Sequence, residues 1–329
     1  MKILVTGGTG YIGSHVVVEL LEQGHEVEIL DNLTNSKITV LDQIEKITNK
    51  KPTFHQIDLL DQPALEKVFN NYFDLVMHFA GLKAVAESVE QPLKYYDNNV
   101  AGTINLLNAM KKHQVYNFIF SSSATVYGDQ EVDRCVETLN TGINITNPYG
   151  KTKYMIEEIL KDLAASDTNF NIISIRYFNP IGNHPTGLIG EDPNGIPNNL
   201  MPYIMKVAKG ELKELSIYGN DYDTEDGTCL RDFIHVVDLA KGHLAAINGL
   251  KPGFSAYNLG TGKPTSVLQM VNTFEKVSGK PLPHKFVARR SGDLAKLYAD
   301  PSKAKQELNW QTSLTIEDAI KDTLTFLNK

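Results

Sequence analysis

The chain has 329 residues, 42% of them hydrophobic and 22% charged, with a formal net charge of −7 at pH 7. This composition is typical of a globular protein with a large core, and the length suggests about two domains. The net negative charge disfavours nucleic acid as a partner, since phosphate backbones bind basic surfaces. The apolar run at the N-terminus is too short for a signal peptide or a membrane span. The two cysteines, Cys135 and Cys229, do not have the spacing of a metal site or a disulfide framework, so we expect a cytoplasmic protein without a membrane partner.

Short apolar runs alternate with longer helical patterns in the first half of the chain. The runs predict strands at Lys2–Thr6, Glu26–Leu30, Thr53–Ile57, Leu75–Phe79, Phe118–Ser121 and Ile172–Tyr177. The patterns between them predict helices at Ile12–Gln23, Leu65–Asn70, Leu93–Lys112 and Tyr149–Ala165. This alternation is typical of βαβ units, so we expect an α/β fold with a Rossmann-type, doubly wound parallel sheet.

The alternation of short apolar runs with helical patterns ends after Tyr177. The stretch Asn179–Pro202 is rich in proline and glycine and predicts irregular structure. We expect it to begin a smaller, mixed α/β C-terminal domain, which divides the chain into residues 1–177 and 178–329. The run Asp232–Leu239 is a further strand-to-helix turn, so residues 232–260 could partly return to the first domain.

A glycine-rich turn follows the first strand and opens the first helix. Gly7, Gly10 and Gly13 have the spacing G-x-x-G-x-x-G. Glycines there allow a tight turn and let the backbone approach a pyrophosphate at the helix N-terminus. Strand, glycines, helix and second strand come in the required order, so the turn predicts a dinucleotide site.

Asp31 ends the second predicted strand, where a carboxylate can accept hydrogen bonds from the adenosine ribose. The 2′-phosphate of NADP would meet this negative charge, and Asn32 brings no compensating cation, so we expect NAD. Asp58 ends the third strand and fits either a contact with the adenine amino group or a helix N-cap. Lys83 could reach the pyrophosphate, although an exposed lysine is the ordinary expectation.

A Tyr-x-x-x-Lys pair, Tyr149 and Lys153, begins a helical segment, and the spacing puts both side chains on one face. Ser123 lies at the end of the fifth strand, at the edge where parallel sheets bind ligands. Tyrosine is a poor base at neutral pH, and bringing its pKa from about 10 to about 7 requires roughly 4 kcal/mol. The Lys153 ammonium and an oxidised nicotinamide could supply this stabilisation. The three residues together predict proton transfer beside a nicotinamide.

These motifs, in this order, resemble the extended short-chain dehydrogenase/reductase superfamily. Longer segments are similar to its UDP-glucose 4-epimerase family over essentially the whole chain: Thr6–His15, His78–Ser88, Tyr95–Val100, Phe118–Gly128, Arg176–Pro180 and Arg231–Asp238. The resemblance implies reversible 4-epimerisation of UDP-galactose and UDP-glucose through a transient 4-keto sugar, with NAD held in the site. Tyr149 would then exchange the proton of the 4-hydroxyl, and Ser123 would hydrogen bond the same oxygen.

The resemblance also implies the residues that bind the ligands. The cofactor would be held by the glycine turn, the catalytic trio and by Tyr11, Ile12, Asp31, Asn32, Leu33, Thr34, Asn35, Ser36, Asp58, Leu59, Phe79, Ala80, Gly81, Leu82, Lys83, Asn98 and Phe178. The nucleotide sugar would be held in the C-terminal domain by Asn179, Asn199, Leu200, Tyr218, Arg231, Arg290, Asp293 and Leu297, besides Ser123. Without the family, Arg289 and Arg290 would look like a solvated charge pair.

Leu297 occupies the position that lines the 2-substituent of the sugar in this family. A tyrosine there is associated with enzymes restricted to UDP-glucose and UDP-galactose, and smaller residues with N-acetylated sugars. Leucine has no ring, which leaves UDP-N-acetylhexosamines open as further substrates. The adjacent Tyr298 could take its place if the loop were shifted by one residue.

Three other interpretations remain to be weighed. A nucleotide-sugar 4,6-dehydratase needs an acid pair after the catalytic serine, where this chain has Ala124 and Thr125. A non-catalytic NAD-sensing regulator would need the glycine turn but not the Tyr/Lys pair. The acidic run Asp221–Gly227 resembles a calcium loop only faintly, so we expect no metal site.

The family suggests a homodimer through the Leu93–Lys112 and Tyr149–Ala165 helices, although core packing would explain their apolar stripes equally well.

Overall fold

The computed structural model describes residues 1–130, 132–192, 199–290 and 293–329. Within these residues, a seven-stranded parallel sheet has the order β12-β7-β5-β4-β1-β2-β3. Its strands are β1 (Lys2–Thr6), β2 (Glu26–Asp31), β3 (Thr53–Gln56), β4 (Leu75–His78), β5 (Asn117–Ser121), β7 (Asn171–Tyr177) and β12 (Gly253–Leu259). The predicted α/β fold with a doubly wound parallel sheet is confirmed.

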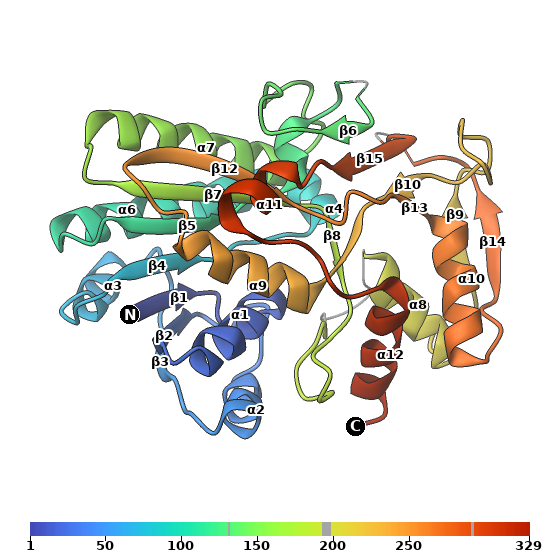
Figure 1. The fold of residues 1–329 in the computed structure, drawn as a ribbon, viewed down its shortest axis with the longest axis horizontal. Helices are drawn as coiled ribbons and strands as arrows, with labels where there is room; N and C mark the ends of the chain where they lie inside the picture. Colours follow the sequence, from blue (N-terminus) through green and yellow to red (C-terminus); the bar gives the residue numbers. More distant parts are fainter. Residues whose placement is uncertain (131, 193–198, 291–292) are drawn as a thin grey trace.

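Helices cover both faces of this sheet (Figure 1). One face carries α1 (Tyr11–Glu22), α2 (Thr39–Thr48), α9 (Val236–Ile247) and α11 (Ser302–Leu308). The other carries α3 (Gln62–Val68), α6 (Gly102–Lys112) and α7 (Pro148–Ser166). Each face buries its own apolar core, which is why the central strands are almost continuously hydrophobic rather than alternating. The helices α2 and α4 (Val85–Glu90) were not predicted from the sequence.

The continuous α-helix predicted over Leu93–Lys112 is wrong in its middle. The chain forms α5 (Pro92–Tyr95), then a π-helical segment η1 (Tyr96–Ala101), and only then α6. The wider turn brings in the buried Asn99, which hydrogen bonds both backbone groups of Leu82. A π-turn inside a helix is often found at a functional site, and η1 also carries Asn98.

The remaining elements gather around the carboxyl ends of the large sheet and to one side of it (Figure 1). They are η2 (Ala124–Tyr127), β6 (Arg134–Cys135), β8 (Asn179–Ile181), α8 (Leu200–Ala208), β9 (Leu215–Tyr218), β10 (Leu230–Arg231), β11 (Phe233–His235), β13 (Thr265–Ser266), α10 (Val267–Ser278), β14 (His284–Val287), β15 (Lys296–Ala299) and α12 (Ile316–Leu327). The short strands form sheets β13-β10-β15-β6, β11-β8 and β14-β9. The helices α8, α10 and α12 share a third apolar core.

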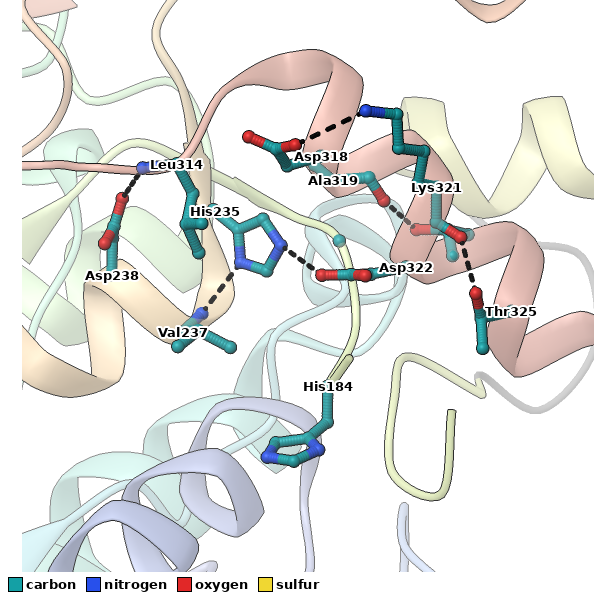
Figure 2. Close-up of polar contacts among 12 residues, drawn as sticks. His184, His235, Val237, Asp238, Leu314, Asp318, Ala319, Lys321, Asp322 and Thr325 are labelled. Atoms are coloured by element: carbon teal, nitrogen blue, oxygen red, sulfur yellow. Dashed lines mark hydrogen bonds and ion pairs between the residues drawn. The ribbon is translucent and has the colours of Figure 1, made fainter. Parts of the chain in front are cut away.

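Segment 232–260 contributes to both parts of the molecule. Its strand β11 pairs with β8, whereas α9 packs on α1 and β12 forms an edge of the large sheet. Figure 2 shows how polar contacts hold α12 there: His235 on β11 hydrogen bonds Asp322 at 3.2 Å, and Asp238 accepts from the backbone of Leu314 at 2.8 Å. In the predicted irregular stretch Asn179–Pro202, β8 and the first turn of α8 are regular, and residues 193–198 lie outside the described residues.

Candidate active site

The glycine turn joins β1, α1 and the end of β4 in one tightly packed unit. Gly7 has a φ of +72°, and a Cβ atom there would lie 2.6 Å from the Ala80 nitrogen. A Cβ atom on Gly13 would lie 2.2 Å from the Gly7 carbonyl oxygen. Side chains are therefore excluded at both positions, and the turn leaves the N-terminus of α1 open, with Gly10 as an N-cap that offers no side chain.

A cleft lies along the carboxyl ends of β1, β2, β3 and β4. Most of the predicted cofactor residues line it: Gly7, Gly10, Asp31, Asn32, Thr34, Asn35, Ser36, Asp58, Leu59, Phe79, Ala80, Gly81, Leu82 and Asn98. Leu30 and Ile57 also line it and were missed, although each lies at the end of a predicted strand beside a predicted contact. The position fits the rule that open α/β sheets bind ligands at the carboxyl ends of their strands.

Other predicted cofactor residues lie outside the lining of this cleft: Ile12, Gly13, Leu33, Lys83, Phe178 and Tyr11. The hydroxyl of Tyr11 donates to the Gly182 carbonyl at 2.5 Å, and its side chain borders a second cavity, beside Glu191 and Met201. Lys83 pairs with Glu191 at 3.0 Å.

Asp31 is buried and organises the loop that follows β2. Its carboxylate accepts from the backbone nitrogens of Thr9 at 3.2 Å and Leu33 at 2.9 Å, and from the Ser36 hydroxyl at 3.0 Å. These donors fix the orientation of the carboxylate in the wall of the cleft.

The helix-cap alternative for Asp58 is wrong, because Asp61 caps α3 by accepting from the Ala64 nitrogen at 3.1 Å. Asp58 instead accepts from the Asn32 amide at 2.8 Å and from the Leu60 nitrogen at 2.9 Å. Asp58 therefore lies in the wall of the cleft, and the predicted contact of its carboxylate with the adenine amino group stays a prediction.

Ser123, Tyr149 and Lys153 come together where β5 meets the first turns of α7. Asn147 caps this helix by accepting from the Gly150 nitrogen at 2.8 Å, which fixes where α7 begins. Lys153 Nζ donates to the Ser121 carbonyl at 2.6 Å and lies 4.7 Å from the centre of the Phe120 ring. All three side chains of the trio are buried.

Burial raises the pKa of Tyr149 well above its ordinary value, with Tyr177 and Tyr95 adding to the effect and a hydrogen bond with Ser123 opposing it. Burial also lowers the pKa of Lys153 to about 7, and Glu157 opposes this change. The apolar surroundings thus disfavour charge on both groups, so a phenolate at Tyr149 needs a cation close by.

Two arginines in the C-terminal half share one carboxylate. Arg290 donates to both oxygens of Asp293 at 3.0 Å, and Arg231 lies 3.5 Å from the same carboxylate. The Arg290 guanidinium also stacks over the half-exposed ring of Tyr218, 5.1 Å from its centre. Arg289 turns to Asp221 instead. The structure therefore brings four predicted substrate residues together, and a planar guanidinium fork suits a diphosphate.

Leu297 packs against an apolar cluster that includes Phe178 and Ala124, the residue after Ser123. In β15, Leu297 pairs with Arg231, whereas Tyr298 pairs with Arg134 of β6. Neighbouring residues of a strand face opposite ways, so Leu297 and not Tyr298 points to this apolar cluster, which favours the prediction of Leu297 over a one-residue shift to Tyr298.

The other predicted substrate residues lie on β8 and at the start of α8. Asn179 lies on β8, next to Phe178. Asn199 and Leu200 begin α8, and the Asn199 amide donates to Glu191 at 2.9 Å, the carboxylate that also pairs with Lys83. Glu191 thus links a predicted cofactor residue with a predicted substrate residue, which no spacing in the sequence indicated.

Comparisons with known proteins agree with this arrangement. Residues 3–260 match the NAD dependent epimerase/dehydratase family. The chain is 55% identical over 326 residues to a UDP-glucose 4-epimerase of Bacillus subtilis, covering 98% of this chain and 96% of the relative. It is 53% identical over 330 residues to the human UDP-glucose 4-epimerase, covering 98% and 94%. The crystal structure of a Bifidobacterium longum UDP-glucose 4-epimerase, in complex with NAD+ and UDP, is similar with a TM-score of 0.96 and 50% identity, covering 100% of this chain and 98% of that one.

Proposed function

The chain belongs to the NAD dependent epimerase/dehydratase family, and we propose that it catalyses the reversible 4-epimerisation of UDP-galactose and UDP-glucose. The observation that carries this proposal is the buried trio of Ser123, Tyr149 and Lys153, in which Tyr149 packs in one apolar cluster with Leu82 of the glycine-walled cleft. The relatives named UDP-glucose 4-epimerase, at 53–55% identity over nearly the full chain, support the substrate class.

The cleft fits NAD. Gly7 and Gly13 leave no room for a Cβ atom, so the backbone itself faces the place of the pyrophosphate. Asp31 presents a buried carboxylate suited to the ribose hydroxyls and opposed to a 2′-phosphate. When bound, NAD supplies the acceptor and the later donor of a hydride.

We assign proton transfer to the trio. The Tyr149 phenolate oxygen accepts the proton of the sugar 4-hydroxyl and later returns it. Ser123 hydrogen bonds the same sugar oxygen and orients it toward Tyr149. The Lys153 ammonium stabilises the phenolate electrostatically. The burial of the three side chains excludes water from this exchange.

We assign substrate binding to the C-terminal half. Arg231 and Arg290 would bind the diphosphate, and Asp293 and Tyr218 would lie at the uridine. Leu297 would line the sugar. On this assignment, residues 1–177 with parts of 232–260 are the cofactor-binding domain, and the rest of 178–329 is the nucleotide-sugar domain.

We also propose a homodimer in the cytoplasm. Leu93 is 80% exposed and Val89 61% exposed, and both lie on elements that contact α7, where Met155 is exposed as well. Such an apolar patch favours association with a second copy. Cys135 and Cys229 are both free, which fits a reducing compartment.

Incubating the purified protein with UDP-galactose and no added NAD tests the function directly. We expect UDP-glucose to form, together with a nicotinamide absorbance change on addition of the UDP-sugar. Tyr149→Phe is the matched control, since it removes one hydroxyl. A wild-type protein that contains NAD but forms no UDP-glucose would refute the proposal.

A further inference from the structure

Three side chains recur every four residues along one face of α7: Tyr149, Lys153 and Glu157. The first two belong to the trio, and Glu157 has no part in the proposed proton transfer. Lys153 donates to the Ser121 carbonyl at 2.6 Å, and the next residue, Ser122, donates its hydroxyl proton to Glu157 at 2.6 Å. The helix face is therefore docked on the end of β5 at successive turns.

Glu157 is a fully buried carboxylate that is held from three directions. Besides Ser122, it accepts from the Ser174 hydroxyl at 2.7 Å and from two nitrogens of Arg176, Nε at 3.0 Å and Nη2 at 2.6 Å. Bidentate, charge-assisted hydrogen bonds of this kind fix both position and orientation. Arg176 continues the network by donating to the Tyr127 hydroxyl at 3.1 Å.

Stability alone does not explain this pair. The desolvation of two buried charges offsets most of their attraction, and apolar side chains of similar volume usually pack at least as well. A buried anion one helical turn from a buried lysine does have an electrostatic effect on that lysine. Glu157 is the charge that raises the pKa of Lys153 against the effect of burial.

No other anion was found to act on Lys153 among the described residues. The groups near it are Tyr149 one turn away on its own helix, the Phe120 ring and the Ser121 carbonyl on β5, and His78 on β4. Tyr177 on β7 accepts from the Ser121 hydroxyl at 3.2 Å. Burial and the nearby Lys153 lower the pKa of His78 to about 3, so this imidazole is neutral at physiological pH.

We infer that Glu157 is a positioning residue of this active site: its carboxylate, clamped by Arg176 and two serines, fixes α7 against β5 and keeps the Lys153 ammonium charged beside Tyr149. The inference rests on the proposed function, in which Lys153 acts as a cation. Since the rate then depends on protonated Lys153, it falls as pH rises through the pKa of that group. Removing the Glu157 charge lowers this pKa, so the alkaline limb must move to lower pH.

The test is the pH profile of kcat for the NAD-loaded enzyme and for Glu157→Gln, which keeps the size of the side chain and an oxygen for the serines. We expect unchanged NAD content, little change in KM, and an alkaline limb about one pH unit lower. Glu158→Gln is the matched control, because Glu158 is the half-exposed neighbour paired with Lys161, and its profile should follow wild type. A folded, NAD-loaded Glu157→Gln enzyme with an unmoved limb would overturn the inference.

If Glu157→Gln does not fold, the pH profile is measured on the double variant Glu157→Gln with Arg176→Met. This variant leaves neither buried charge unpaired. Because this variant also removes the Arg176 cation, its limb is compared with that of Arg176→Met alone: a lower limb in the double variant supports the inference, and an equal limb overturns it. Failure of the proposed function is a different result: the wild type itself would then form no UDP-glucose at any pH.

Discussion

Replacing Asp31 with alanine should change which cofactor the protein accepts. The carboxylate lies at the end of β2 and lines the cleft, and three protein donors hold it there. In the proposed complex it accepts hydrogen bonds from the adenosine ribose, so the variant loses these bonds. It also loses the negative charge that opposes a 2′-phosphate.

The magnitude follows from those two effects. A hydrogen bond to a charged group contributes about 1.5–3 kcal/mol, so losing two of them should raise the Kd for NAD by at least about 100-fold. The repulsion of a 2′-phosphate by Asp31 is worth several kcal/mol, and NADP is relieved of it in the variant. The ratio of the NADP to the NAD Kd should therefore fall by at least about tenfold.

Calorimetric titration of both cofactors into cofactor-stripped protein measures this ratio. Asp31→Ala also frees the backbone nitrogens of Thr9 and Leu33, which loosens the loop. Loosening weakens both cofactors alike, so the ratio reports the ribose contact and not the loop. Ser36→Ala is the control, since it removes one donor to the carboxylate and leaves the charge, and its ratio should equal that of wild type. An unchanged ratio in Asp31→Ala would mean that this carboxylate does not face the ribose.

Three further predictions concern the reaction and the turn. Tyr149→Phe should retain NAD and lose at least about 100-fold in kcat. Ser123→Ala should lose less in kcat, because it removes a hydrogen bond and not the proton acceptor. Steady-state kinetics of the two variants measure which loss of kcat is larger. Gly13→Ala should abolish NAD binding, since its Cβ would lie 2.2 Å from the Gly7 carbonyl oxygen; measurable retention of NAD would show that the turn can widen. UDP-N-acetylgalactosamine should be turned over less efficiently than UDP-galactose, and Leu297→Tyr should remove the activity toward the N-acetylated sugar selectively. Equal effects of the substitution on both sugars would show that Leu297 does not determine the sugar specificity.

The cofactor half of the site could be predicted from the sequence because its parts are close in sequence to the strands that position them. Gly7 follows directly on β1 and Asp31 is the last residue of β2, and the ends of parallel strands meet at one edge of a sheet. Tyr149 and Lys153 are four residues apart on one helix. Local periodicity is sufficient for such relations.

Relations between distant segments were not predictable in this way. The strands β6 and β15 pair residues more than 160 positions apart, and both are too short to show a period. The π-helical segment was missed because the sequence over Leu93–Lys112 has an ordinary helical pattern, and the wider turn depends on the buried contacts of Asn99 with Leu82. Tertiary contacts override propensity at such positions.

The Arg290 cluster shows most clearly why the substrate half needs a structure. In the sequence, Arg289 and Arg290 look alike, but one extends to Asp221 and the other to Asp293, which also attracts Arg231 from a strand about 60 residues away. Two guanidiniums against one carboxylate leave a net positive charge beside Tyr218. A diphosphate brought there can bind the guanidiniums without first displacing every partner, since Asp293 accounts for only one of the two charges. The positive charge that Asp293 leaves uncompensated is the physical reason for proposing that the diphosphate binds there.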